Sequence, residues 1–223
     1  MVKTAAMLRP VVCALAIFAA ATVVAQSSVG LRAGTTFSKG VYDDDDLDEV
    51  SYLTAGYLVG VPAEFILTEN FGVQAEVNLL QRGQRTEIEF DFFGAQIRDE
   101  TITRLTYLDF AGLAKAGLLD DELTVAAVAG PSLSYALGGR NVDEEGDTEK
   151  IDWDDEGNTL RRLDFGFAFG AQAGMAIGPG RVVLDARYRF GLNDLTDDGD
   201  GAAVTLHSRA FSGSLGYLLP LEF

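Results

Sequence analysis

Apolar and polar residues alternate with a period of two along much of this chain. In the clearest segment, 181–191, the even positions from Val182 to Phe190 are all apolar, while most odd positions are charged. Successive side chains of a β-strand point to opposite faces, so this segment is predicted to be a strand with one apolar and one charged face. The same period predicts seven further strands, over 29–38, 52–66, 71–82, 107–118, 123–137, 162–177 and 207–223.

The connections between these eight strands alternate in length along the chain. The long ones span 39–51, 85–101, 138–160 and 192–206, and the short ones centre on 68–70, 120–121 and 178–180. Transmembrane barrels have short periplasmic turns and long external loops. The pattern therefore predicts an all-β fold, an eight-stranded antiparallel up-and-down transmembrane β-barrel, with both termini in the periplasm and four loops outside.

The period alone does not say which face of the strands points inward. A soluble barrel places its apolar face inside, whereas a membrane barrel places it in the lipid. The polar faces carry many small residues beside the ions, among them Gly30, Gly166, Gly170 and Ser214. An eight-stranded barrel has an interior just wide enough for side chains, so small residues beside a few long ions indicate a crowded polar lumen.

Charged residues on the polar faces are the candidate site. A buried charge has to be paired, and both signs occur in similar numbers, which predicts an ion-pair network that fills the lumen. The alternative is a narrow path for ions. The predicted lumen network comprises Arg32, Glu64, Glu76, Arg82, Asp109, Lys115, Arg162, Asp164, Asp185, Arg187 and Arg189.

The chain ends on an aromatic residue preceded by hydrophobic residues at every second position: Tyr217, Leu219, Leu221 and Phe223. This resembles the C-terminal signature of outer-membrane barrels. The resemblance implies that the barrel-assembly machinery and the lipid of the outer membrane are partners of this chain.

Five stretches extend the resemblance over nearly all of 29–223. They are Gly30-Leu31-Arg32-Ala33-Gly34, Phe71-Gly72-Val73-Gln74-Ala75-Glu76, Tyr107-Leu108-Asp109-Phe110, Ala129-Gly130-Pro131 and Leu184-Asp185-Ala186-Arg187-Tyr188. In this order they resemble the outer-membrane β-barrel domain of the "porin family" proteins common in Bacteroidetes-like, Gram-negative bacteria. The resemblance implies the eight-stranded fold and the location, and little about activity.

The N-terminal segment differs from the rest. Lys3 and Arg9 precede an apolar run over 11–24, and Val23-Val24-Ala25 offers small residues for cleavage. This is typical of a secretory signal peptide, so we predict a signal peptide at 1–25 and a barrel domain at 26–223. A transmembrane anchor is the alternative, but the run is short for a bilayer span. Cys13 lies in the signal, which leaves the mature chain without thiol chemistry.

The net charge of the chain is −17, and removal of the two basic residues of the signal brings it to −19. Such a charge repels nucleic acid, and we expect no nucleic-acid partner. The four long connections hold 24 of the 34 acidic residues. Asp43–Asp46 and Asp194–Asp200 could bind a divalent cation such as calcium weakly. We favour a solvated acidic surface, because the EF-hand-like start at Asp194 lacks an acidic residue at its twelfth position, Thr205.

No catalytic, cofactor or metal site is predicted. His207 is the only histidine, and the lipid-modifying barrel enzymes of the deacylase type use a His-x-Ser pair, whereas Arg209 stands at that position here. We therefore expect a non-enzymatic outer-membrane barrel with a side-chain-filled lumen and a structural or surface-interaction role. Two alternatives stay open at this point: a narrow channel for ions or small solutes, and a soluble barrel that binds a small ligand.

Overall fold

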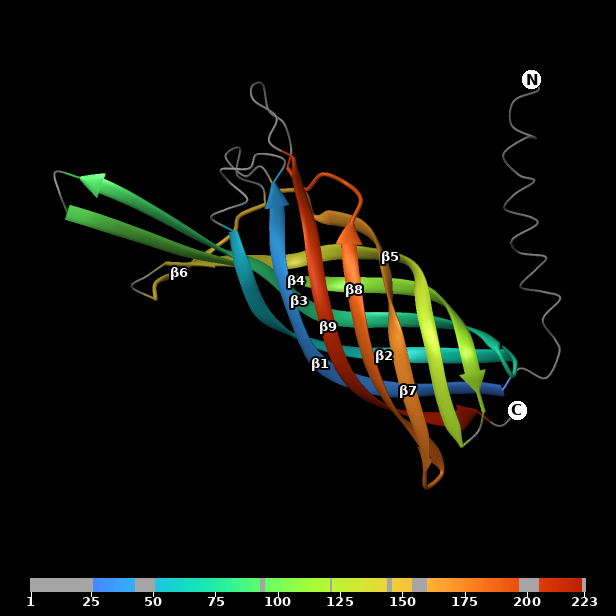
Figure 1. The fold of residues 1–223 in the computed structure, drawn as a ribbon. Coiled ribbons are helices and arrows are strands. Elements are labelled where there is room, and N and C mark those ends of the chain that lie inside the picture. Colours follow the sequence, from blue (N-terminus) through green and yellow to red (C-terminus); the bar gives the residue numbers. More distant parts are fainter. Residues whose placement is uncertain are drawn as a thin grey trace, which may run out of the picture.

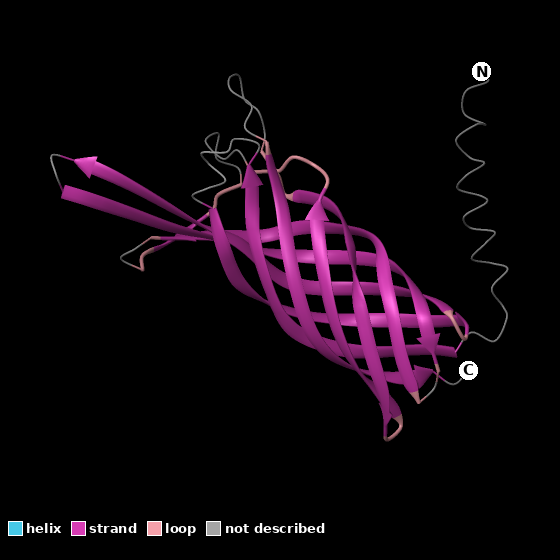
Figure 2. Ribbon diagram, viewed as in Figure 1, coloured by secondary structure: helices cyan, strands magenta, loops and turns pink. Residues whose placement is uncertain are grey.

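A computed structural model of the chain describes residues 26–42, 51–92, 95–120, 122–143, 146–153, 160–196 and 205–221. The strands are β1 (Gln26–Tyr42), β2 (Ser51–Thr68), β3 (Phe71–Phe92), β4 (Ala95–Leu119), β5 (Leu123–Val142), β6 (Thr148–Lys150), β7 (Leu163–Ile177), β8 (Gly180–Gly191) and β9 (Leu206–Leu221). The described residues form strands joined by turns and loops (Figure 2). Among them no helix has the length and apolar character to span a membrane.

Eight of these strands close into a barrel in which each is antiparallel to its neighbours. The ladder runs from β4 through β3, β2, β1, β9, β8 and β7 to β5, and pairing of β4 with β5 closes it. The first and last barrel strands meet along their full length, from Ser27 opposite Leu221 to Tyr42 opposite Leu206. The predicted eight-stranded antiparallel barrel is confirmed. β6 lies outside the barrel and pairs with the end of β5.

The short connections lie together at one end of the barrel, and the strand ends that flank the long connections lie at the other (Figure 1). Local hydrogen bonds close the short turns: the Thr68 hydroxyl accepts the backbone N–H of Phe71 at 3.0 Å. At the last turn Gly178 has φ +64°, a left-handed conformation that glycine adopts without steric cost. β1 begins and β9 ends at this short-turn end, as the even number of strands requires.

The two faces of the strands differ sharply in burial. Phe165 and Phe169 are 45% and 48% exposed on the outside of the barrel, whereas Glu64 and Asp164 inside it are fully buried. The apolar face is therefore the outer one, as the small residues of the polar face predicted. This arrangement contradicts the soluble-barrel alternative, in which the same phenylalanines would form the core.

Glycine on the inner face makes room for long ionic side chains. A Cβ atom added at Gly166 would lie 2.7 Å from the guanidinium carbon of Arg189. Gly60 makes room in the same way for the Asn78 amide. The crowding expected of a narrow lumen is thus present.

The prediction of a loop over 85–101 was wrong. β3 and β4 continue past the barrel wall and pair from Arg85 opposite Ile102 to Phe92 opposite Ala95, forming a hairpin that projects from the long-loop end (Figure 1). The two strands satisfy each other's backbone groups, so the acidic residues of the segment do not prevent pairing. In the sequence, the alternation of polar and apolar residues at Glu87, Ile88, Glu89 and Phe90 indicates that the strand continues here.

Candidate functional site

The lumen holds ten of the eleven predicted ions. They come from six of the eight barrel strands, and all are buried: Arg32, Glu64, Glu76, Arg82, Asp109, Lys115, Asp164, Asp185, Arg187 and Arg189. Their distribution along the barrel axis forms three clusters, each organised around carboxylates.

The cluster at the short-turn end is centred on Glu64 of β2. Its carboxylate accepts hydrogen bonds from the Lys115 ammonium and from the Arg181 guanidinium, and both contacts are ion pairs. Arg181 also donates to the Thr124 hydroxyl at 3.1 Å. One buried acid therefore faces two bases from strands on different sides of the lumen.

The middle cluster joins Glu76 and Asp185 through two arginines. Both terminal nitrogens of Arg187 donate to the Glu76 carboxylate at 2.8 Å, a bidentate geometry, and Arg32 Nη2 donates to the same group at 2.7 Å. Arg187 Nε also donates to Asp185 Oδ2 at 2.8 Å. Gln172 donates its amide to Asp185 at 2.7 Å. Bidentate, charge-assisted bonds of this kind are strong and fix side-chain orientation.

The third cluster lies towards the long-loop end and is centred on Asp164 of β7. Its Oδ2 atom accepts from Arg82 Nη1 at 2.7 Å, Arg189 Nη1 at 2.9 Å and Ser208 Oγ at 2.7 Å. The Arg82 guanidinium carbon lies 4.4 Å from the centre of the Tyr107 ring. Cation–π contact adds to the ion pair here, because the guanidinium is withdrawn from water.

A layer of apolar side chains covers this third cluster, which the sequence analysis did not predict. Its buried members are Leu58, Leu80, Leu105, Tyr107 and Ala136, and Ile151 and Trp153 pack against them. Leu80 lies between Asn78 and Arg82 on the lumen face of β3, so the alternation along this strand indicates that Leu80 points into the lumen. The lumen therefore contains a packed apolar layer near the long-loop end in addition to the ion clusters.

The prediction for Arg162 was wrong. This residue precedes the first residue of β7, and its guanidinium lies 5.2 Å from the centre of the Trp153 ring and 3.4 Å from the hydroxyl of the exposed Tyr135. Alternation cannot direct a side chain beyond the end of its strand. Arg181 is not a member of the predicted network, but it lies in the lumen beside Glu64.

Little free space remains between the clusters. A cavity inside the lumen, bordered by Gln74, Gln172, Asp185 and Ser214, has a volume of about 10 Å³. That is about the space of one water molecule. Side chains therefore occupy most of the described lumen around this cavity.

A larger pocket of about 250 Å³ opens above the apolar layer, at the mouth of the long-loop end. Apolar, hydroxyl and basic side chains border it, among them Tyr42, Gln84, Leu105, Tyr107, Leu160, Arg161, Leu195 and Ser208. A pocket with an apolar floor and a few polar groups is typical of a small-molecule site.

Two residues considered for chemistry are engaged locally. His207 Nδ1 lies 3.2 Å from the Asn193 carbonyl oxygen. Partial burial disfavours the charge of the Asp194 carboxylate, but hydrogen bonds from the backbone N–H groups of Thr196 and Leu206 outweigh it and hold the pKa of Asp194 below its usual value. Asp194 thus links the loop that precedes β9 to Leu206, the first residue of that strand, by a hydrogen bond. The described residues include no group of three or more metal-ligating side chains, and Asp43–Asp46 lie outside them.

The predicted C-terminal signature is described up to Leu221. Tyr217, Leu219 and Leu221 all point outward on β9, with 36%, 45% and 41% of their surface exposed. The Tyr217 hydroxyl donates to the Ile177 carbonyl oxygen at 2.9 Å, which ties β9 to the last short turn. Phe223 and the predicted signal peptide lie outside the described residues.

A family model agrees with this architecture. Residues 24–197 match the family model described as "Outer membrane protein beta-barrel domain". Similar solved structures include the attachment invasion locus protein Ail of Yersinia pestis, with 14% identity over 87% of this chain and 99% of Ail, at a TM-score of 0.43. Neisserial surface protein A has 13% identity over 86% of this chain and 97% of its own, with a TM-score of 0.45. No curated protein matches by sequence.

The Escherichia coli outer-membrane protease OmpT is also similar, with 13% identity over 90% of this chain and 98% of its own, at a TM-score of 0.45. Likeness at this level carries no argument about activity. The family match covers most of the chain. The closed barrel and its apolar outer face agree with that family. The chain belongs to the outer-membrane protein β-barrel domain family, and its location is the outer membrane.

Proposed function

We propose that this protein is an integral outer-membrane barrel with a closed lumen, which serves a structural or surface-interaction role rather than solute passage. The observation that carries the proposal is the set of three ion clusters around Glu64, Glu76 and Asp164, with a cavity of only about 10 Å³ near them. An eight-stranded barrel leaves an interior that side chains can fill. The proposed role is non-enzymatic.

The interaction role is assigned to the long-loop end, which we place outside the cell. Long external loops and short periplasmic turns are the rule for such barrels. The pocket of about 250 Å³ at this end supports contact with an external ligand of unspecified identity. The acidic connections around it are proposed to form a solvated surface with at most weak affinity for divalent cations.

We further propose that the signal peptide at 1–25 directs the chain across the inner membrane. The barrel-assembly machinery would then insert the barrel into the outer membrane by reading Tyr217, Leu219, Leu221 and Phe223. The outward direction of the first three supports such reading, since they are accessible along one strand face. The five quoted stretches support a finer placement among the porin-family barrels of Bacteroidetes-type bacteria.

The test is conductance in planar bilayers. The refolded mature chain, residues 26–223, should give no steady conductance, under conditions in which a known general porin does. The double variant Glu76→Ala/Arg187→Ala removes both partners of the central bidentate pair, and it should admit ions if it folds. Steady conductance of the wild type would overturn the closed-lumen proposal and favour the narrow channel.

A further inference from the structure

The charges inside the lumen do not balance. In the described part of the chain the lumen carries five acids and, with Arg181, six bases. The middle cluster is balanced, because two acids pair with two arginines. The cluster towards the long-loop end also holds two acids and two arginines. The excess positive charge therefore belongs to the cluster at the short-turn end.

In this cluster two bases share a single carboxylate. One oxygen of Glu64 accepts from the Lys115 ammonium, and the other accepts from the Arg181 guanidinium. Arg181 makes one more hydrogen bond, to the Thr124 hydroxyl, and its Nε atom has no partner among the described residues. A buried charge without a counter-charge is costly. One additional anion beside these bases would therefore stabilise the cluster.

Arg181 borders a vestibule at the short-turn mouth of the barrel. The vestibule has a volume of about 410 Å³, and its border includes Ser28, Ile66, Ala176, Leu218 and Pro220 together with the turn at 178–180. Ile66 lies two residues beyond Glu64 on the same face of β2, so it points into this mouth. With 13% of its side chain exposed, Arg181 is more accessible than the other lumen bases. The excess charge thus faces a space that a small molecule can enter.

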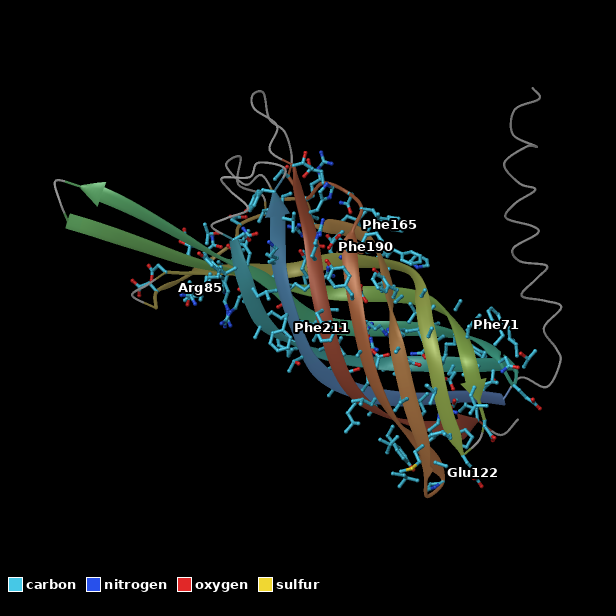
Figure 3. The ribbon with its side chains drawn as sticks, in the orientation of Figure 1. Phe71, Arg85, Glu122, Phe165, Phe190 and Phe211 are labelled. Carbon is cyan, nitrogen blue, oxygen red and sulfur yellow. The ribbon has the colours of Figure 1, made fainter. Side chains whose placement is uncertain are left out.

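The border of the vestibule is apolar or hydroxylic apart from Arg181, and no described acidic side chain contributes to it. The acids described at this end, Glu69, Asp120 and Glu122, lie on the short turns and are exposed. Glu122 is labelled at this end of the barrel in Figure 3. Water and salt screen exposed charges more strongly than buried ones. The turn acids therefore oppose an anion less than the buried cluster attracts it.

We propose that the short-turn vestibule binds a small amphipathic monoanion, whose carboxylate pairs with Arg181 and whose hydrocarbon part lies against Ile66 and Leu218. A monoanion makes the numbers of acidic and basic charges equal, whereas a dianion would reverse the imbalance. The apolar border favours an organic acid over an inorganic ion. A mostly apolar pocket of this size with one charged group is typical of a small-molecule site.

This site is distinct from the surface role proposed for the long-loop end. Its existence does not depend on the proposed orientation of the barrel, which decides only that the vestibule opens to the periplasm. Conductance is a separate measurement, so the closed lumen and the anion site can fail independently.

The experiment follows binding of para-(trifluoromethyl)benzoate by fluorine NMR. The refolded mature chain, residues 26–223, is measured in detergent micelles, with empty micelles as the blank. The benzyl alcohol and the benzylamine with the same substituted ring are the neutral and cationic controls. Wild type should bind the benzoate roughly tenfold or more tightly than the alcohol, as expected of one charge-assisted hydrogen bond. The amine should not bind above the blank.

Arg181→Gln leaves Glu64 and Lys115 as a balanced pair, so the barrel should fold and lose the preference for the benzoate. Lys115→Met should also weaken benzoate binding, because Arg181 then has the Glu64 carboxylate to itself. Arg181→Lys keeps the charge and should retain most of the binding. Arg140→Gln is the matched control, since it removes an exposed cation from the opposite end of the barrel and should bind like wild type.

Equal affinity for the benzoate and the alcohol would overturn the proposal, and so would unchanged benzoate binding by folded Arg181→Gln. Either result would mean that the cluster is balanced without a ligand, for example by loss of the Lys115 proton. Displacement of the benzoate by an equal concentration of chloride would also overturn it, because the site would then take a small inorganic ion.

Discussion

Replacement of Asp164 by asparagine tests whether the lumen is held together by ion pairs. The aspartate and the amide have nearly the same shape, so the change removes a charge and leaves the volume almost unaltered. In the native protein one carboxylate oxygen serves Arg82, Arg189 and the Ser208 hydroxyl, at 2.7, 2.9 and 2.7 Å. After the change, two buried guanidinium groups lose their shared counter-ion.

Breaking a buried pair by removal of one partner typically costs about 3–5 kcal/mol. The lower end of that range is expected here, about 3 kcal/mol, because other partners persist. Arg82 still has Asp109 at 4.0 Å, and Arg189 still donates to the Ser132 hydroxyl at 2.8 Å. The additional change Arg189→Gln removes one stranded cation and should recover part of the loss, with a coupling free energy of roughly 0.5–3 kcal/mol.

The measurement is urea unfolding in lipid vesicles, followed by the fluorescence of Trp153 and by the mobility shift of the folded barrel on detergent gels. Glu149→Gln is the matched control, since it removes the same charge from the exposed strand β6. It should leave the midpoint unchanged. If Asp164→Asn unfolds at the same urea concentration as wild type, the ion network does not stabilise the barrel and this reasoning is refuted.

The remaining predictions concern the lipid face, the topology and the loop before β9. Leu215→Arg, on the outer face midway along β9, should cost about 2–4 kcal/mol in vesicle unfolding, whereas Leu123→Arg at the short-turn end should cost about 0–1 kcal/mol; equal costs would contradict the depth assigned to them. Protease added to intact cells should cleave within 138–160 and spare the turn at Gly178, and the reverse pattern would invert the orientation. The protection factors of the Thr196 and Leu206 amide protons, which compare each exchange rate with that of an unprotected amide at the same pH, should be high at neutral pH and fall as the pH falls through the lowered pKa of Asp194, because a carboxylate with a depressed pKa stabilises the fold above its unfolded pKa and loses that effect on protonation. Asp194→Asn should abolish this pH dependence.

The local pattern of the chain was enough to predict the barrel. Period-two alternation in segments such as 181–191, with alternating connection lengths, specified eight antiparallel strands and assigned each side chain to one of two faces. Small residues such as Gly166 then indicated which face was crowded and inside. These properties were readable because alternation is a property of each strand's own backbone and needs no knowledge of its neighbours.

The partners of each ion were decided by the tertiary structure. Glu64 meets Lys115 and Arg181, which lie 51 and 117 residues away in the sequence. These contacts depend on closure of the sheet and on the stagger between strands, which fix the height of every residue along the barrel axis. Alternation gives the face of a side chain but not its height, so ten members of the network were predicted and its three clusters were not.

The β-bulge in β5 is a second feature that the tertiary structure decided and the alternation of the sequence did not predict. An extra residue in β5, at the shift between Thr106 and Tyr107 of β4, brings Arg140 opposite Arg104 and turns it to the outer face. Strict alternation from Ser134 and Ala136 would have directed Arg140 into the lumen. A bulge reverses the faces of all residues beyond it, and its place depends on pairing with the neighbouring strand. The sequence therefore determined the barrel and the set of charges, whereas strand register decided which charges meet inside and which face the membrane.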